Sequence, residues 1–565
     1  PPTLILRSGQ RMTSRCSWPD DRFVLIVGLV AMFVTSIPYS LGAAMTTDER
    51  VFGGFVYAVE DCYSYLAKMR QGAEGSWVFH IAYTPEPHPG ALFFLFHLLL
   101  GKIAAAVPVG TLTARMVYVY HVARWVFGLG LLLTLYRFLA AFTDRRLVRR
   151  LAWLMTTFGG GLGWLILFLG QSDWLGSTPL DFILPEGFTF LVLYAFPHIA
   201  LGRTLLLWGI LWLMDAWKDV PTPKPQAKSQ TSPSLRRRWL IGRALLTGCL
   251  WLAMGLIVPF YVAVAWAVAG AGLAALILRE RRIPWTKVSL ACVAGLISAP
   301  VVLYSTWRFA SDPTYAAWAA QNRILSPHPL HYLAAYGVPL SLSAFAVRAA
   351  WSDRGRLWLV LAWVAVVPLL IYLPFNLQRR LVEGVQVPLS LLAAMGLMRL
   401  LGPRLGLSGL RSKLVMATLL LVMIPTNAMV VAGGAMSLRG RPGPIFRDAE
   451  EVAALDWLGL RAAAADVVLS SYETGNYLPA RVRARAFVGH GPESVRAEEK
   501  KALVRRFFDA TTEDSWRRDL LERYGVDYVL WGPAERGLGT FDPQAAAYLQ
   551  PAYGRGGYSV FEVVE

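Results

Sequence analysis

Charged residues are scarce in this sequence, and their scarcity excludes an ordinary soluble protein. Only 16% of the 565 residues are charged, whereas about a quarter are charged in soluble domains. Hydrophobic residues make up 55% of the chain, and apolar runs of roughly 20 residues, the length that crosses a bilayer, recur along it. The sequence therefore predicts an α-helical polytopic membrane protein.

Cysteines are also few, and no internal repeat is evident. The four cysteines are Cys16, Cys62, Cys249 and Cys292, and their spacing fits neither a zinc site nor a disulfide framework. Cys62 is interpreted as a small packing residue.

Many transporters are built from internal repeats, so the missing repeat argues against that class.

Acidic residues do not balance the basic ones over the whole chain, where the net charge is +18. From Arg441 to the end, however, there are 16 Lys and Arg against 19 Asp and Glu. The positive excess therefore lies among the apolar segments, where cytoplasmic positive charge orients membrane proteins. This distribution argues against nucleic acid as a partner.

Basic residues are missing altogether from residues 171–197, and this gap orients the chain. Arginine-rich loops are typical of the cytoplasmic side, so residues 171–197 are predicted to be external and the N-terminal residues 1–22 cytoplasmic. The first apolar run is too long for a removable signal. The expected spans number about eleven: 23–43, 121–142, 151–170, 198–217, 239–258, 260–278, 286–307, 331–350, 357–374, 385–401 and 414–433.

The chain is predicted to have a cytoplasmic N-terminus (1–22), a transmembrane domain (23–439) and a small extracytoplasmic α/β domain (440–565). Within external loop 44–119, the apolar stretch 90–107 is expected to lie in the membrane interface, because its length is marginal for a span. Strand-like and helical runs alternate after residue 440, which predicts a partly parallel sheet. The expected strands are 467–471, 485–488, 528–531 and 558–564, and the expected helices are 495–509 and 513–524.

An adjacent acidic pair, Glu60-Asp61, stands near the start of the long external loop. We interpret it as the centre of one external cavity to which the other external loops contribute. The remaining candidate binding residues are polar or aromatic side chains of these loops and of span mouths: Tyr65, His88, Arg124, His198, Asn322, Gln378, Arg379 and Arg380.

These residue types suit a sugar carried on a lipid phosphate. A carboxylate can accept the proton of an acceptor hydroxyl while that oxygen attacks the anomeric carbon. Arginines present fixed forks of donors to a phosphate, and aromatic rings and amides suit sugars. The alternative use of Glu60 and Asp61 is to hold a divalent cation such as Mg²⁺ or Mn²⁺, which prefers oxygen ligands.

Each feature also has a purely structural interpretation. Adjacent acids in a loop are commonly only solvated, and arginines near a span end can snorkel to the interface. His88 and His198 can serve the loops that hold them. His490, between two glycines, can reach the rim of the cavity, but it is interpreted as a loop histidine of the same structural kind. The external position of Arg379 and Arg380, against the charge rule, favours a functional role for those two.

Taken in order along residues 23–142, these features resemble the GT-C superfamily of membrane glycosyltransferases. The order is an acidic pair, a tyrosine, the run KMRQG (68–72), a proline-rich turn, an amphipathic helix and an arginine that enters a span. The likeness is to the protein O-mannosyltransferase and lipid A aminoarabinose transferase group in particular. It implies that Glu60-Asp61 carries the catalytic base and that Arg124 matches the group's arginine.

Other parts match the group less fully. Residues 378–380 (QRR) are similar to its external arginine site for lipid phosphate. The acids stand in the order Glu-Asp, which leaves open which one is the base; we favour Asp61, with Glu60 as helper or metal ligand. His88 interrupts the proline pair of the turn at residues 87–90.

The resemblance implies an inverting glycosyltransferase that uses a polyprenyl-phosphate sugar at the external face of a bacterial plasma membrane. Its acceptor is a protein, a lipid or a glycan, and membrane lipids surround it. One alternative is a transporter or flippase of lipid-linked sugars, and another is a non-catalytic membrane scaffold whose external domain binds a partner. The scaffold would tolerate substitution of Glu60 and Asp61.

Overall fold

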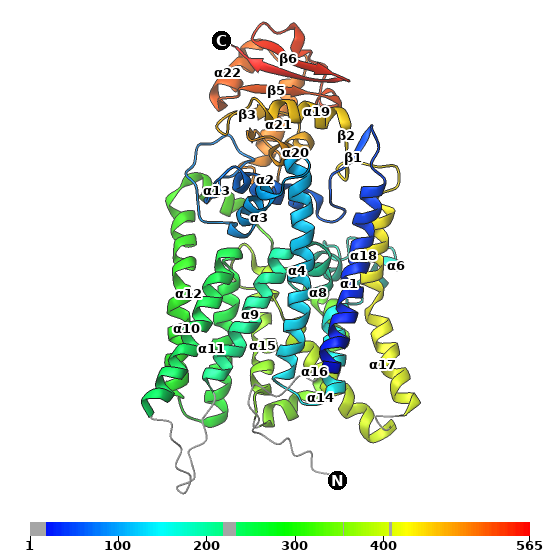
Figure 1. Ribbon diagram of the computed structural model, residues 1–565, viewed down its shortest axis with the longest axis vertical. Coiled ribbons are helices and arrows are strands. Elements are labelled where there is room, and N and C mark those ends of the chain that lie inside the picture. Colours follow the sequence, from blue (N-terminus) through cyan, green and yellow to red (C-terminus); the bar gives the residue numbers. More distant parts are fainter. Residues whose placement is uncertain (1–17, 218–232, 354, 406–408, 565) are drawn as a thin grey trace. The chain divides into compact units, whose positions relative to one another are not determined.

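The computed structural model describes residues 18–217, 233–353, 355–405 and 409–564. Helices dominate it, as the apolar runs predict (Figure 1). The helices up to residue 216 are α1 (Trp18–Ala44), α2 (Val59–Ala73), α3 (Leu95–Ala106), α4 (Leu112–Ala140), α5 (Arg146–Phe158), α6 (Gly163–Phe168), α7 (Leu180–Ile183), α8 (Thr189–Ala195) and α9 (Pro197–Ala216). Those up to residue 436 are α10 (Pro233–Ile257), α11 (Tyr261–Glu280), α12 (Trp285–Ser311), α13 (Pro313–Gln321), α14 (Leu330–Ser352), α15 (Leu357–Leu370), the 3₁₀ helix η1 (Gln378–Val382), α16 (Gln386–Leu405), α17 (Leu410–Met423) and α18 (Pro425–Met436).

The C-terminal part alternates strands and helices. Its helices are α19 (Ala449–Gly459), α20 (Tyr472–Arg481), α21 (Ala497–Phe508), α22 (Asp514–Tyr524), α23 (Pro533–Arg536) and the 3₁₀ helix η2 (Pro543–Ala545). The strands of the chain are β1 (Arg50–Phe52), β2 (Phe446–Asp448), β3 (Val467–Leu469), β4 (Arg485–Ala486), β5 (Tyr528–Trp531), β6 (Leu549–Arg555) and β7 (Tyr558–Val563). Strands β1 and β2 form an antiparallel pair, and the other five form one sheet.

The five-stranded sheet has the order β4-β3-β5-β7-β6. Strand β3 runs parallel to β4 and β5, whereas β7 is antiparallel to β5 and β6. The predicted partly parallel sheet is therefore present, and all four expected strands belong to it. Helices α21 and α22 cover it through an apolar core that includes Val504, Phe507, Leu520 and Leu521.

All eleven expected spans coincide with helices. Among the described residues, eight helical stretches are long and apolar enough to cross a membrane, and the bent pair α17–α18, with an angle of 41° at its break, makes a ninth. The other two expected spans correspond to α15 and to residues 386–401 of α16, which are apolar but shorter than the rest. Within the stretch 90–107, residues 95–106 form α3, a helix of 12 residues, and its location in the membrane interface stays a prediction.

The chain forms two compact units, which we describe separately. Unit 1 consists of the chain up to Thr35 together with Arg124–Ser305 and Ile324–Val430, and unit 2 consists of Ser36–Ala123, Thr306–Arg323 and the chain from Val431 on. Unit 2 therefore contains the acidic pair, the loop around it that is predicted to be external, and the C-terminal sheet. The domain boundary predicted after residue 439 stays a prediction.

Candidate active site

Helix α2 of unit 2 begins with the acidic pair. Ala58, just before it, has a positive φ of 48° and no side-chain cap. The first turn of a helix leaves backbone N–H groups without intrahelical partners and carries the positive end of the helix dipole. Both features stabilise the carboxylates of Glu60 and Asp61. Tyr63 and Leu66 bury the opposite face of α2, while Glu60 is exposed.

Asp61 is hydrogen-bonded to His490, a residue 429 positions further along the chain. The two atoms, Asp61 Oδ1 and His490 Nε2, lie 3.0 Å apart. Because an ionised carboxylate only accepts hydrogen bonds, Nε2 carries the proton and donates. The His490 side chain is 5% exposed and that of Asp61 is 45% exposed. A buried ring therefore fixes one oxygen of a carboxylate that remains open to solvent.

The other nitrogen of His490 faces a buried ion pair. Nδ1 lies 3.5 Å from Glu493 Oε1, and the Lys68 ammonium donates to the same oxygen over 2.6 Å. Lys68 and Glu493 are 1% and 6% exposed, and a buried ammonium needs such a partner. Lys68 also donates to Ser64, one turn earlier in α2. Hydrogen bonds therefore join Lys68 to Glu493 and His490 to Asp61, while His490 Nδ1 lies near Glu493 without a hydrogen bond.

Glu60 is held by different partners. Its Oε2 accepts a hydrogen bond of 3.0 Å from the Tyr472 hydroxyl, which itself accepts from the Gly491 amide over 2.9 Å. Burial, and then the negative charge of Glu60, raise the pKa of Tyr472, so the phenol keeps its proton and donates. The two acids are therefore distinguishable by their environment, which their order in the sequence does not reveal.

The loop between β4 and α21 carries His490 on a tightly fixed backbone. The Ser494 hydroxyl accepts from the amides of Gly489 and His490 over 3.0 and 3.2 Å. A Cβ on Gly489 would lie 2.2 Å from the carbonyl carbon of Gly475 in α20, so the two backbones touch there and only glycine fits. Gln321, at the end of α13, donates to the Ser494 carbonyl over 2.7 Å.

The proline-rich turn at residues 84–90 is tied to the same region. Glu86 accepts from Lys500 over 2.6 Å and from Arg496 over 3.2 Å, and also from Thr84. Burial alone would raise the pKa of Glu86, but the Lys500 ammonium and these hydrogen bonds outweigh it and hold the pKa below its ordinary value. Burial also lowers the pKa of Lys500 to about 8, against the pull of Glu86.

We expect the stability that Glu86 contributes to be lost in acid. Because its pKa is lowered by folding, the contribution is present above the ordinary pKa of 4.5 and disappears as the pH falls through the lowered value. The unfolding temperature of the detergent-solubilised protein should exceed that of a Glu86→Gln variant at about pH 6, and the difference should shrink below pH 4.5. A difference that stays constant into stronger acid would contradict the assignment.

His88, a candidate binding residue, uses both ring nitrogens inside its own turn. Nδ1 donates to the Glu86 carbonyl over 2.8 Å, and Nε2 accepts from the Ile81 amide over 2.8 Å. Burial lowers the pKa of His88, which suits this neutral form. In this structure the ring shapes the turn, as the structural interpretation of the sequence expects.

Tyr65 and Asn322, two further candidates, also lie in unit 2. The Tyr65 ring stacks on His97 with centroids 4.6 Å apart and an interplanar angle of 14°. Asn322 ends α13, where its backbone N–H donates to the Trp318 carbonyl one turn back. The side chain that contacts the loop of His490 is that of its neighbour Gln321. The structure therefore links Gln321, and not Asn322, to the loop that contacts Asp61.

Arg379 and Arg380 lie in η1 of unit 1 beside one buried carboxylate. Arg380 Nη1 is 3.7 Å from Glu186 Oε1, with the two side chains 36% and 3% exposed. Arg379 Nε is buried and has no hydrogen-bond partner among the described residues. Burial lowers the pKa of Arg379, and the negative charge of Glu186 opposes this effect. Arg379 is therefore charged, as arginine is in proteins. Two guanidinium groups against one carboxylate leave a local positive excess, which suits an anion.

Gln378 and Arg124 are engaged within unit 1. Gln378 Oε1 accepts from the Ser326 amide over 3.0 Å, so this side chain braces the loop beside η1. Arg124 is 2% exposed and donates to the Thr35 hydroxyl and the Leu193 carbonyl over 3.0 and 3.1 Å. These bonds fasten α4 to α1 and to α8.

Helix α9 contributes a buried ion pair that the sequence does not reveal. Both the Arg203 and the Glu383 side chains are 0% exposed, and Arg203 Nη2 donates to Glu383 Oε2 over 3.0 Å. Arg203 also donates to the Thr189 hydroxyl over 3.1 Å. His198, a candidate from the sequence, starts the same helix, 8% exposed, with its ring edge-on to Phe196.

The acidic pair belongs to no larger group of metal-ligating side chains among the described residues. Among the described residues, no group of three or more His, Cys, Asp or Glu side chains is arranged to hold a cation. One oxygen of Glu60 and one of Asp61 accept hydrogen bonds, from Tyr472 and His490 respectively. The use of Glu60 and Asp61 by Mg²⁺ or Mn²⁺ therefore stays a prediction, and no chemical step is assigned to a metal.

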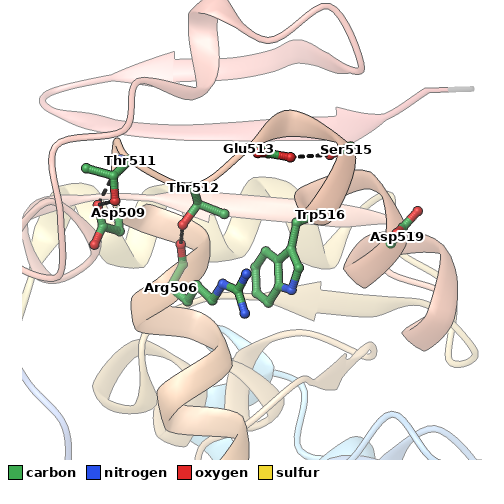
Figure 2. Close-up of a pocket in the computed structure, with 8 residues that line it drawn as sticks. All are labelled: Arg506, Asp509, Thr511, Thr512, Glu513, Ser515, Trp516 and Asp519. Carbon is green, nitrogen blue, oxygen red and sulfur yellow. Dashed lines mark hydrogen bonds between the residues drawn. The ribbon is translucent and has the colours of Figure 1, made fainter.

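Figure 2 shows a hollow elsewhere in unit 2, between the end of α21 and the start of α22. Its volume is about 580 Å³. The Arg506 guanidinium lies 4.2 Å from the centre of the Trp516 ring, and Asp509 accepts from Thr511. The ring is therefore already covered and the rim is acidic and exposed. This hollow shares no residue with the group around Asp61.

Sequence reasoning missed Glu493, Tyr472 and the role of His490. The signals were present, since the segments at 471–481 and 487–494 stand out by their glycines and polar residues. No local pattern, however, shows that these segments meet α2 more than 400 positions earlier. Only the folded chain brings them together.

No protein-family model matches this chain, and no curated protein sequence matches it. Similar folds exist among solved structures. The oligosaccharyltransferase of the archaeon Archaeoglobus fulgidus in its apo form has a TM-score of 0.51 at 14% identity, over 96% of this chain and 75% of that one. The same enzyme tethered to an acceptor peptide with an NVT sequon gives 0.50 at 12% identity, over 90% and 69%.

ArnT from Cupriavidus metallidurans bound to undecaprenyl phosphate has a TM-score of 0.47 at 12% identity, over 96% of this chain and 98% of that one. The oligosaccharyltransferase comparisons confirm the predicted GT-C fold. At such identities they show the fold alone. With its apolar helices, the chain is a multi-pass membrane protein.

Proposed function

We propose that this protein is a glycosyltransferase that moves a sugar from a polyprenyl-phosphate carrier to an acceptor hydroxyl, with inversion at the anomeric carbon. The observation that carries the proposal is the Asp61 carboxylate, which is oriented by a buried imidazole and still 45% exposed. A carboxylate of this kind can act as a general base. The GT-C fold, shared with an oligosaccharyltransferase, supports the same reaction class.

The proposed reaction is a single displacement. Asp61 takes the proton of the acceptor hydroxyl as its oxygen attacks the anomeric carbon. The bond from that carbon to the phosphate oxygen breaks, and the polyprenyl phosphate leaves with the bonding electrons. Glu60, held by Tyr472, acts as a helper that accepts hydrogen bonds from substrate hydroxyls. The acceptor itself is a protein, a lipid or a glycan.

Arg379 and Arg380 are proposed to bind the donor phosphate. Their positive excess over Glu186 supports this role, since guanidinium groups match phosphate oxygens with paired donors. They would also stabilise the charge that develops on the leaving phosphate. The proposal includes the predicted orientation, with residues 44–119 and 440–565 on the outer face of a bacterial plasma membrane.

Replacing Arg379 by Met should weaken donor binding. We expect the apparent KM for the polyprenyl-phosphate sugar to rise about tenfold, which corresponds to about 1.4 kcal/mol and to the lower end for one hydrogen bond to a charged group. Initial rates over a range of donor concentrations measure it. Arg348→Met, an exposed arginine of α14, is the matched control. An unchanged donor KM in a folded Arg379→Met protein would remove this residue from the phosphate site.

The function is tested by transfer of a labelled sugar. Membranes that contain the wild-type protein are incubated with a panel of polyprenyl-phosphate sugars, and labelled product is separated from the lipid donor. Transfer above the level of membranes without the protein supports an enzyme. A donor that crosses the membrane without losing its sugar would instead support a flippase and contradict the proposal.

A further inference from the structure

We infer that His490, a residue of the C-terminal sheet region, positions the Asp61 carboxylate for proton transfer. The inference rests on the proposed function and extends it, because it assigns to the loop after β4 the role of orienting the catalytic carboxylate. It also decides between the two acids: Asp61 is the base, and Glu60 is the helper. Four features of the structure carry it.

The contact between the two residues is asymmetric. His490 is almost entirely buried, at 5% exposed, whereas Asp61 is 45% exposed. The buried partner is the immobile one, so the imidazole sets the orientation of the carboxylate and not the reverse. A hydrogen bond of 3.0 Å to one carboxylate oxygen restricts rotation about the bond that joins the carboxylate to Cβ.

The backbone under His490 is rigid. Its carbonyl accepts from the amides of Glu493 and Ser494 over 3.0 and 2.7 Å, while its own amide donates to the Ser494 hydroxyl. The loop packs backbone to backbone on α20 at Gly475 and Gly489, because a Cβ on Gly475 would lie 1.9 Å from the Val488 carbonyl oxygen. These hydrogen bonds therefore fix the backbone position from which the His490 imidazole extends toward Asp61.

The ring itself is oriented on its far side. Nδ1 faces Glu493, whose carboxylate is held by the Lys68 ammonium. The Tyr83 ring lies 5.5 Å from the imidazole at an angle of 47°. Lys68 and Asp61 both belong to α2, so the cation that holds Glu493 and the carboxylate that His490 contacts lie on one helix. The ring is therefore enclosed between Glu493 and Tyr83, and its hydrogen bond to Asp61 fixes Nε2 relative to α2.

Glu60 lacks this kind of support. Its partner is the hydroxyl of Tyr472, and the contact is exposed to solvent. The Glu60 side chain is also one methylene longer than that of Asp61, so a single contact at its tip leaves more rotatable bonds unrestrained. A misplacement of about 1 Å at a reacting group can cost on the order of a hundredfold in rate. The acid with the rigid partner is therefore the better base.

The test compares His490→Gln with His490→Asn. The Gln amide nitrogen reaches the place of Nε2, whereas the Asn amide nitrogen reaches only that of Nδ1. We expect His490→Asn to lower kcat about a hundredfold with the donor KM within about twofold, and His490→Gln to keep at least about tenfold more activity. His80→Asn, a histidine of the same unit with an exposed side chain, is the matched control. Equal loss in the Gln and Asn variants would overturn the inference.

A double-mutant cycle shows whether His490 acts through Asp61. In an Asp61→Asn background, His490→Asn should lower the remaining transfer by less than about twofold, because residues that act as a unit are not additive. A full hundredfold loss in that background would overturn the inference. If Asp61→Asn abolishes transfer but His490→Asn does not, only the inference fails. If the wild type shows no transfer, the proposed function fails instead.

Discussion

Replacing Asp61 by Asn is expected to lower sugar transfer about a thousandfold. General-base catalysis contributes about 10²- to 10⁴-fold, and the amide cannot take the acceptor proton. The Asn side chain keeps the shape of Asp61 and retains an oxygen that can accept from His490, so the protein should fold and bind its donor normally. Single-turnover transfer with saturating donor measures the loss in the chemical step, separately from binding.

Glu60→Gln is the matched control for this experiment. It removes one charge from the same helical turn and keeps the acceptor for the Tyr472 hydroxyl, so we expect a loss of no more than about tenfold. A large loss in Glu60→Gln with a normal rate in Asp61→Asn would exchange the roles of the two acids. Normal transfer in both variants would remove the pair from the reaction and favour a scaffold.

Much of the fold follows from apolar run length. The eleven expected spans are helical, two of them as the interrupted pairs α5–α6 and α17–α18, because roughly 20 apolar residues can bury themselves in lipid only with their backbone groups paired. One strand of the C-terminal sheet, β6, does not follow from the sequence pattern. It contains Pro551 and Gly554, which are typical of turns, but it is an edge strand, where proline is tolerated.

The site could be predicted only in part. The pair Glu60-Asp61 is one of several adjacent acidic pairs in the chain, and it stands out because aromatic and basic residues and a proline-rich turn follow it. Its place in the first turn of α2 follows the preference of carboxylates for helix N-termini. The partners of the two acids could not be predicted, because the contact with His490 depends on how the loop after β4 packs on α2. Hydrogen bonding between residues 429 positions apart leaves no periodic signal in a single sequence.

Arg203→Met should destabilise the protein by about 3–5 kcal/mol, the range for removing one partner of a buried ion pair. The variant leaves the Glu383 carboxylate buried at 0% exposure without its cation. It also removes the donors to the carbonyls of Pro185 and Glu186, which Arg203 Nη2 reaches over 3.0 and 2.8 Å. Thermal unfolding of the detergent-solubilised protein measures the effect, as a lower apparent unfolding temperature than that of the wild type.

Two further variants separate the buried charge from the lost packing. In Arg203→Met combined with Glu383→Gln, no uncompensated charge remains, so the double variant should be more stable than Arg203→Met alone, a coupling that only interacting residues show. Arg380→Met tests an arginine of the same unit that is 36% exposed in its pair with Glu186, and exposed pairs contribute about 0–1 kcal/mol. Equal destabilisation by Arg203→Met and Arg380→Met would contradict the burial argument. A clear difference would show that the buried Arg203–Glu383 pair contributes more to the stability of unit 1 than the partly exposed Arg380–Glu186 pair does.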